Sequence, residues 1–515
     1  MKEAPVVLDN SNIVESYPGI TLPLTYSFIQ IAYRGVFGGA VAAHLKNGKI
    51  LSKYENVFDN MIAIHNGRIY YAINNWYALI DFIPFSKKII PIWQDMMGVK
   101  NTEVYMGRLH RFTLPQKMRL YWNVLKTALG VPRSMKRLEG DFAGAQKYFD
   151  DTYTENLTVP ELIGLFREIE RRVLDKWHIT VANDMYCFVW TGILKARLAK
   201  KGIDATEVTK YISGITGLES LKPVRALLEL AKKHGDDPDL LGLPAVREYI
   251  RIYGDRCPQE LKLECMTYRE CPALLEEQVR AYAKDKNKLD GMIANLEARK
   301  ETKAGFAGFV GKKARLGIKN REISRLNRAR IYGMVRRIFV DIGKKVFGGD
   351  WSDIFYLTAD EIFRGEFDIG LIEKRKAEYA EYEKMPYRAR LVFSGGIQIE
   401  EAAPAARPGA LRGLGASRGS FEGEAVVLDE PSGDVEVEGK IIVTKTTDPG
   451  WVFLLCRAGG IVAEKGSLLS HTSIISRELK IPAVVAVENA TSAIKTGDMI
   501  RICGDDGRVE IVGAD

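Results

Sequence analysis

The segment that most restricts what this chain can fold into is residues 466–487, which contain a single histidine, His471. A glycine-containing turn leads into Ser470, a residue type that favours helix N-caps. Apolar residues then recur at helical spacing until Pro482, where a buried-type strand begins. His471 is therefore expected in the first helical turn, beside backbone N–H groups without intrahelical partners. This position at the positive end of the helix dipole suits an imidazole that takes up and releases a phosphoryl group.

The segment resembles the phosphohistidine signature of the phosphoenolpyruvate-utilising enzymes: a glycine-rich turn, Ser-His, a helix of small residues, Arg-Glu and then Ile-Pro-Ala-Val-Val. Residues 414–419 (Leu-Gly-Ala-Ser-Arg-Gly) and 447–451 (Thr-Asp-Pro-Gly-Trp) resemble two earlier motifs of the same domain. Residues 497–509 look like its closing hairpins. The resemblance implies that His471 is phosphorylated and that residues 411–515 form a small, swivelling α/β domain.

Two cations near the histidine are candidate catalytic residues. Phosphoryl transfer needs positive charge near the equatorial phosphoryl oxygens, and Lys465 and Arg477 lie on either side of His471 in the sequence. Lys465 stands where the family often has arginine, which keeps the charge but loses the bidentate geometry. A role in holding its own loop is the alternative for Lys465.

The residues before this domain predict a larger, mainly α-helical unit, so the expected fold class is multidomain α+β. Helices are predicted over 30–45, 158–176, 188–200, 221–233, 272–298 and 321–345, a strand or hairpin over 65–71, and short strands over 425–428, 440–444, 460–463, 483–487 and 499–503. An Ala/Pro/Gly-rich stretch, residues 396–410, predicts a partly flexible hinge linker. The candidate hinge residues are Gly395, Gly396, Pro404 and Pro408. The predicted domains are thus 1–395, the linker 396–410, and 411–515.

The large unit resembles the substrate-binding, or acceptor, domain of rifampin-phosphotransferase-like proteins. The matching stretches are residues 12–25, 66–71, 253–260 with 268–272, and 353–361. On this resemblance Arg256 is the candidate cation of the acceptor domain, and Glu260 orients it or serves as a base. A structural ion pair between the two is an equal alternative. The family commonly has histidine where Asp255 stands.

An aromatic-rich region in the large unit could line an apolar pocket for an acceptor. Core packing is the alternative for most of these side chains. The candidate substrate-binding residues are His65, Arg68, Tyr70 and Trp76.

The resemblance also implies a partner. Only eleven residues precede the motif that opens at Asn12, so we expect the ATP-grasp domain of the family, with its ATP and Mg²⁺, on a separate nucleotide-binding subunit, as in phenylphosphate synthase. The expected reaction moves a phosphoryl group from ATP through His471 to a small organic hydroxyl compound, with a phenol as one candidate and AMP and phosphate as co-products. Little sequence follows the histidine domain, which disfavours pyruvate as acceptor. The alternatives are a ligase of the prodigiosin-forming type and a non-catalytic phosphocarrier.

Composition excludes several other classes. With 46% hydrophobic and 27% charged residues and no long apolar run, the chain reads as a cytoplasmic protein without a membrane partner. Its six cysteines are scattered, which argues against a zinc site, and no metal ligands are predicted. The net charge of +8 is concentrated in residues 300–345. This basic helix is either a solvated face or a docking surface for an acidic partner or a polyphosphate, because no nucleic-acid-binding motif accompanies it.

Overall fold

The computed structural model describes residues 5–80, 82, 90, 94, 110–202, 208–212, 215, 221–257, 261–283, 289, 293, 305–385, 388–394, 397–399, 411–429, 435–447 and 451–512. The chain divides into two compact units, each assembled from separated segments. Unit 1 comprises residues 1–186, 261–264 and 327–403, and unit 2 comprises residues 187–260, 265–326 and 404–515. The predicted histidine domain, residues 411–515, therefore falls within unit 2 together with helical residues from the middle of the chain. The predicted domain boundaries stay a prediction, and the candidate hinge residues Gly395, Gly396, Pro404 and Pro408 lie outside the described residues.

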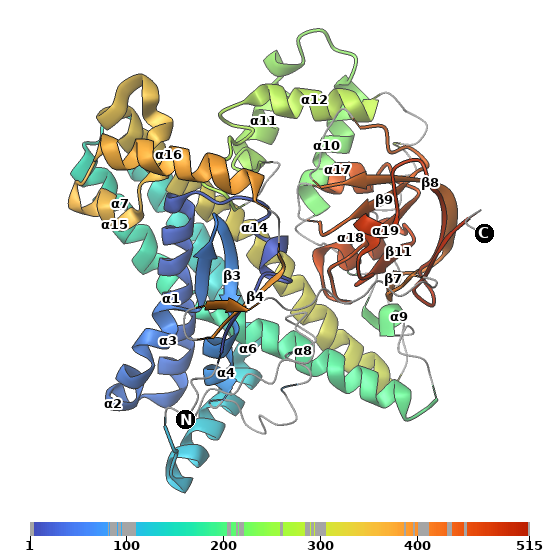
Figure 1. Ribbon diagram of the computed structural model, residues 1–515, viewed down its shortest axis with the longest axis horizontal. Helices are drawn as coiled ribbons and strands as arrows, with labels where there is room; N and C mark the ends of the chain where they lie inside the picture. Colours follow the sequence, from blue (N-terminus) through green and yellow to red (C-terminus); the bar gives the residue numbers. More distant parts are fainter. Residues whose placement is uncertain are drawn as a thin grey trace. The chain divides into compact units, whose positions relative to one another are not determined.

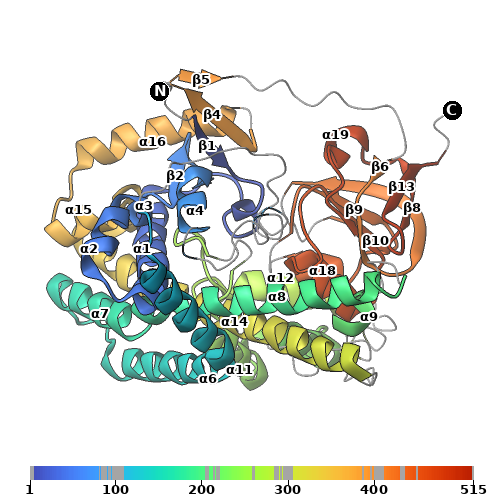
Figure 2. The ribbon, with the colours of Figure 1, turned by 90° about the horizontal axis from the view of Figure 1, so that it is seen from below.

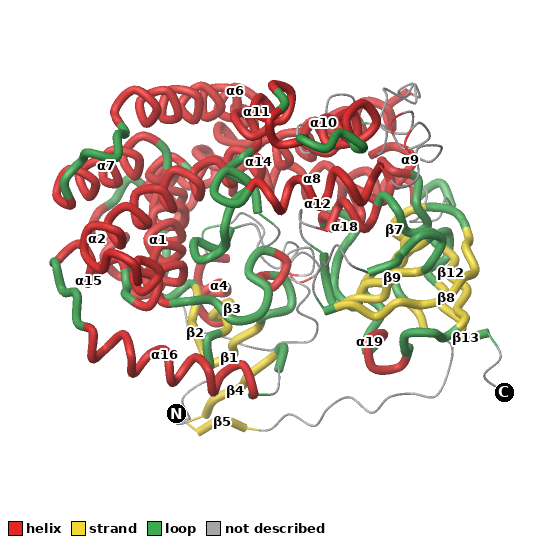
Figure 3. The backbone as a smooth tube through the Cα atoms, turned by 90° about the horizontal axis from the view of Figure 1, so that it is seen from above, coloured by secondary structure: helices red, strands yellow, loops and turns green. Residues whose placement is uncertain are grey.

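Unit 1 combines a helical core with a small antiparallel sheet. Its helices of more than five residues include α1 (Pro23–Leu45), α4 (Ile73–Ile80), α6 (Leu114–Thr152), α7 (Val159–Arg172), α15 (Ala359–Arg364) and α16 (Ile369–Lys384). The short helices are α2 (Gly48–Leu51) and α3 (Glu55–Asp59). The sheet has the order β2-β3-β1-β4-β5, with strands β1 (Val6–Asp9), β2 (Ile62–His65), β3 (Arg68–Ala72), β4 (Arg390–Ser394) and β5 (Ile397–Ile399). Helix α16 runs beside this sheet (Figures 2 and 3). The predicted hairpin over residues 65–71 is confirmed, since β2 and β3 pair across it.

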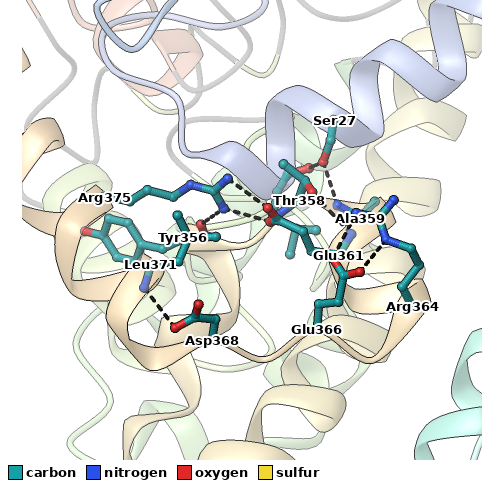
Figure 4. A network of polar contacts seen from close by, with 11 residues as sticks. Ser27, Tyr356, Thr358, Ala359, Glu361, Arg364, Glu366, Asp368, Leu371 and Arg375 are labelled. Atoms are coloured by element: carbon teal, nitrogen blue, oxygen red, sulfur yellow. Dashed lines mark hydrogen bonds and ion pairs between the residues drawn. The ribbon is translucent and has the colours of Figure 1, made fainter.

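Aromatic packing and helix capping stabilise the helices of unit 1. Phe28 of α1 packs edge-on against Phe166 of α7, with ring centroids 6.2 Å apart, and both side chains are fully buried. Thr158 and Thr358 each open a helix with a capping box, which satisfies backbone N–H groups that the first turn leaves free. Figure 4 shows the second of these caps, where Glu361 also accepts two hydrogen bonds from Arg375, of 2.7 and 2.9 Å.

Unit 2 contains the C-terminal sheet and the helices that share its core. The helices are α9 (Val208–Ile212), α10 (Leu221–His234), α11 (Pro244–Tyr253), α12 (Pro272–Ala283), α17 (Val452–Leu455), α18 (His471–Leu479) and α19 (Ala490–Ala493). The sheet has the order β6-β13-β12-β8-β9-β10-β11-β7. Figure 1 labels its strands β7, β8, β9 and β11 in the orange-to-red part of the chain. Its strands are β6 (Leu411–Arg412), β7 (Leu414–Ser417), β8 (Ser420–Leu428), β9 (Ile441–Thr444), β10 (Gly460–Ala463), β11 (Ala483–Val485), β12 (Met499–Cys503) and β13 (Arg508–Ile511).

Strands β8, β9, β10 and β11 are parallel. Strand β12 pairs antiparallel with β8 and β7 with β11, and β13 and β6 extend the sheet antiparallel beyond β12. The predicted strands over residues 425–503 are confirmed, and so is the α+β fold class. Helix α18 lies between β10 and β11 in the chain. It forms the crossover connection that two adjacent parallel strands need. Parallel strands of an open α/β sheet commonly gather ligand-binding residues at their carboxyl ends, and α18 begins beyond the carboxyl end of β10.

Two long helices, α8 (His178–Ala199) and α14 (Gly305–Phe347), contribute residues to both units. Helix α14 starts sixteen residues earlier than the predicted helix 321–345. At Gly317 an added Cβ would lie 2.8 Å from the Cβ of Cys187. A glycine is therefore used here to bring α14 close to α8 rather than to end the helix.

In the part of the chain that the structure describes, no helix is both long enough and apolar enough to cross a bilayer. The six cysteines are unbridged.

Candidate functional site

The first residue of α18 is His471, as the sequence predicts. The N-cap Ser470 accepts a hydrogen bond from the backbone N–H of Ser473 at 3.3 Å. The Ser473 hydroxyl donates to the Ser467 carbonyl at 2.6 Å, which closes the turn that precedes the helix. Gly466, in the same turn, has φ = 134°, and an added Cβ would lie 3.1 Å from both Ser470 Oγ and Val485 Cβ. The local sequence thus folds into a tight turn that fixes the position of His471 at the start of the helix.

The His471 side chain is buried and unsatisfied. Only 2% of the residue is exposed, and neither Nδ1 nor Nε2 has a hydrogen-bond partner among the described residues. Buried polar atoms are almost always paired, because leaving one unpaired costs free energy. A buried histidine with both nitrogens unpaired indicates a group that binds or reacts there.

Two arginines place positive charge near this imidazole. The pKa of His471 lies well below its usual value, first because of burial and then because of the charges of Arg325 and Arg256. The ring is therefore neutral at neutral pH, and a neutral ring nitrogen carries the lone pair that a nucleophile needs. The same two cations can balance the negative charge of a phosphoryl group once it is attached.

Helix α14 supplies Arg325 and holds the loop before His471. Arg321, one turn earlier, donates from Nη1 to the Leu469 carbonyl at 3.2 Å. Arg325 Nη1 lies 3.6 Å from Oε1 of Glu322, whose side chain is fully buried. The sequence analysis noted the basic character of this helix but did not name Arg321 or Arg325 as site residues. The feature that could have identified them is the run of basic residues in this helix. Its interpretation as a docking surface for a polyphosphate agrees with the position of Arg321 and Arg325 near His471.

Arg256 lies three residues beyond α11, in unit 2 with His471. Its backbone is held in a turn, since its N–H donates to the Tyr253 carbonyl at 3.1 Å and its carbonyl accepts from Tyr268 at 2.9 Å. The sequence analysis placed Arg256 in the acceptor domain, and the structure brings its charge to the histidine. Its predicted companion Glu260 lies outside the described residues.

The two cations predicted within the histidine domain differ in their surroundings. Arg477 is 6% exposed, and its Nη1 donates to the Ala416 carbonyl of β7 at 3.2 Å. Burial lowers its pKa to about 10. Lys465 is half-buried, and its ammonium makes no hydrogen bond or ion pair to a described residue. Lys465 thus keeps a cation available beside the turn, whereas Arg477 anchors α18 to the sheet; their catalytic roles stay predictions.

A pair of threonine hydroxyls, which the sequence analysis did not name, lies beside the histidine. Thr447 Oγ1 and Thr472 Oγ1 are 2.6 Å apart, and both side chains are buried. Thr447 opens the second motif identified in the sequence, whose next three residues are outside the described part.

The predicted substrate-binding residues lie in unit 1, and their described contacts are structural. Tyr70 and Trp76 donate to the Arg388 and Met61 carbonyls, at 2.9 and 3.1 Å. Arg68 donates to two backbone carbonyls near the end of α16. His65 packs against the Phe393 ring, and burial lowers its pKa. A role in binding an acceptor stays a prediction for all four.

Among the described residues, no group of three or more His, Cys, Asp or Glu side chains is arranged to hold a metal ion.

Comparison with known proteins identifies the histidine unit. The family model "PEP-utilising enzyme, mobile domain" matches residues 435–507, which include β9, β10, α18 and β11. The chain thus contains, at these residues, a match to the mobile domain of the PEP-utilising enzymes. Rifampicin phosphotransferase of Bacillus subtilis is 31% identical to it over 356 residues, which are 60% of this chain and 39% of that protein. A probable phosphoenolpyruvate synthase of Staphylothermus marinus is 39% identical over 132 residues, 25% of this chain and 15% of that protein.

One relative aligns over nearly the whole chain. An uncharacterized protein of Mycobacterium tuberculosis is 23% identical over 545 residues, 98% of this chain and 61% of that protein. The chain spans 34% to 39% of the length of the first three rifampicin phosphotransferases that it matches.

Proposed function

We propose that this protein is a phosphotransferase that carries a phosphoryl group on His471 and passes it to the hydroxyl of a small organic acceptor. The observation that carries the proposal is the imidazole itself. It is buried and neutral, neither nitrogen has a hydrogen-bond partner among the described residues, and it begins a helix beside the charges of Arg325 and Arg256. The match of the mobile domain and the likeness to rifampicin phosphotransferases support it.

In the first step, a ring nitrogen of His471 attacks the phosphorus of the donor. The N–P bond forms as the P–O bond to the leaving group breaks, and the arginine charges balance the phosphoryl oxygens. In the second step, the acceptor oxygen attacks the same phosphorus, the N–P bond breaks and the hydroxyl proton is lost. The imidazole returns to its neutral form, which its low pKa favours.

The proposed donor is the β-phosphoryl group of ATP, supplied by an ATP-grasp unit with Mg²⁺ on a separate subunit. ATP, water and the hydroxyl compound then give the phosphate ester, AMP and phosphate. The orphaned nitrogens and nearby arginines suit a phosphoryl group, whereas the described residues offer no metal cluster. We propose that Mg²⁺ binds with the nucleotide on the partner subunit.

Label transfer tests the proposal. The chain is mixed with its ATP-grasp partner and with ATP labelled at either the β or the γ phosphorus, and protein-bound label is measured. We expect only the β label on the protein, bound in an acid-labile and base-stable form, as expected for an N–P bond.

His471→Ala should abolish labelling. His234→Ala is the matched control, since His234 pairs with Asp237 at 2.9 Å and has no part in the proposed reaction. Retention of the β label in His471→Ala would exclude this histidine as the carrier.

A further inference from the structure

Unit 1 contains a second group of polar side chains, made of three buried tyrosines together with a fourth tyrosine, Tyr33, and an arginine, Arg328, that are partly buried. The hydroxyls of Tyr17 and Tyr332 are 2.7 Å apart, and those of Tyr33 and Tyr71 are 3.3 Å apart. Tyr17, Tyr71 and Tyr332 are each no more than 8% exposed. The four residues come from the N-terminal loop, α1, β3 and α14, so folding brings together phenols that are far apart in sequence.

Arg328 lies among these phenols. It precedes Tyr332 by four residues on α14, so the two side chains share one helix face. Burial raises the pKa of all four phenols, and the charge of Arg328 opposes that rise in each of them. The carboxylate of Asp184 also acts on Tyr33 and raises its pKa.

Arg328 lacks a counter-charge in the described structure. Its Nε is buried without a hydrogen-bond partner, and the guanidinium forms no ion pair with a described carboxylate. Arg375, in the same unit, shows the usual arrangement, with two hydrogen bonds to the Glu361 carboxylate (Figure 4). The residue as a whole is partly buried, so a ligand that reaches the guanidinium can supply the negative charge that the described residues do not.

We propose that Arg328 and the four tyrosines bind a small aromatic carboxylate. A guanidinium matches a carboxylate through two parallel hydrogen bonds, and the phenols add further donors. One cation suits a monoanion better than a doubly charged phosphate. The ring of Trp76 lies 4.8 Å from Tyr71, and that of Phe28 lies 5.0 Å from Tyr332, so aromatic surfaces flank the cluster.

Resting on the proposed function, the bound compound is the acceptor, a hydroxylated aromatic acid. Its carboxylate is held by Arg328 and its ring hydroxyl is left to receive the phosphoryl group. The hydroxyl oxygen forms the new O–P bond, the N–P bond to His471 breaks, and the hydroxyl proton is released.

Calorimetric titration with 3-hydroxybenzoate tests the site, and 3-hydroxybenzyl alcohol serves as the uncharged probe. We expect the wild-type chain to bind the acid at least about tenfold more tightly than the alcohol, because the ligand gains charge-assisted hydrogen bonds. Arg328→Met should erase that preference, and Tyr332→Phe should weaken binding of the acid while leaving the charge in place.

Thermal unfolding separates a binding role from a structural one. Without ligand, Arg328→Met should unfold at the same temperature as wild type or higher, since it removes a charge that forms no ion pair with a described carboxylate. Arg375→Met, the matched control, should unfold at a lower temperature. Equal affinity of wild type and Arg328→Met for the acid, no binding of the acid, or a fall in melting temperature like that of Arg375→Met would each overturn the inference.

The His471→Ala variant keeps this test apart from the proposed function. It should bind 3-hydroxybenzoate as wild type does. If the acid binds but His471 takes up no label, the Arg328 binding site is supported and the phosphotransferase proposal is contradicted. Label on His471 with no binding of the acid would do the opposite.

Discussion

The side-chain hydroxyls of Thr447 and Thr472 are 2.6 Å apart in a contact that solvent hardly reaches, with the two residues 0% and 1% exposed. Thr472 directly follows His471 in α18, and Thr447 lies three residues after β9. This contact ties the second motif of the mobile domain to the helix that presents the histidine. It gives the motif a positioning role.

Thr447→Val tests that role. Valine has nearly the shape of threonine but leaves the buried Thr472 hydroxyl without this partner, so the free energy of unfolding should fall by about 1–3 kcal/mol. Label uptake by His471 should slow as the helix start loses its support. Urea unfolding and the initial rate of labelling measure the two effects. Thr447→Ser, which keeps the hydroxyl, should stay close to wild type, and equal behaviour of the two variants would refute the role.

Gly466→Ala should distort the turn before His471. The backbone there has φ = 134°, a region that residues with a side chain rarely adopt, and the new methyl group would crowd Val485. We expect a loss of about 1–3 kcal/mol of unfolding free energy and slower labelling of His471. Gly164→Ala is the control, because Gly164 lies in α7 with open space around it and should be neutral or slightly stabilised. An unchanged Gly466→Ala variant would show that the turn tolerates a side chain.

Much of the histidine domain could be predicted from the sequence because its signals are local. Ser470 caps the helix through its own side chain, and the alternation of short apolar strands with turns appears directly in residues 425–503. The start of α18 at His471 follows from those signals alone. The surroundings of the imidazole do not, since Arg325 and Arg256 are 146 and 215 residues away in the sequence and only the tertiary fold brings their charges to it.

The same reason explains the limits of the predicted site in unit 1. Tyr70 and Trp76 belong to the aromatic-rich stretch, but their polar atoms bond to backbone carbonyls of their own unit. The polar cluster instead combines Tyr71 from that stretch with Tyr33 and Tyr332 from distant helices. No local pattern marks Arg328 as different from the other arginines of a basic helix. Only the three-dimensional structure shows that it forms no ion pair with a described carboxylate.

The stability of the protein should depend on pH through His471. Its pKa is depressed in the folded state, so the unfolded chain binds a proton that the folded chain does not, and stability falls as pH drops below the unfolded value of about 6.5. Between pH 7.5 and 5.5 this one group should cost about 1.4 kcal/mol. Urea unfolding of wild type and His471→Asn at both pH values measures it, because groups common to both cancel. Equal losses in the two proteins would mean that His471 titrates normally.

Arg325→Gln should separate the electrostatic role of Arg325 from its structural one. The substitution removes a charge near His471, so the pKa of the imidazole should rise and phosphoryl transfer should slow. It also leaves the fully buried Glu322 without its ion-pair partner, which lies 3.6 Å away, at a cost of about 3–5 kcal/mol.

The double variant Arg325→Gln/Glu322→Gln resolves these two effects. Removing the buried carboxylate with its partner should restore most of the unfolding free energy, while label uptake by His471 stays slow. Labelling kinetics and urea unfolding on the same preparations give both readouts. If labelling recovers together with stability, Arg325 acts by supporting the fold; if stability recovers alone, its charge acts on the phosphoryl group.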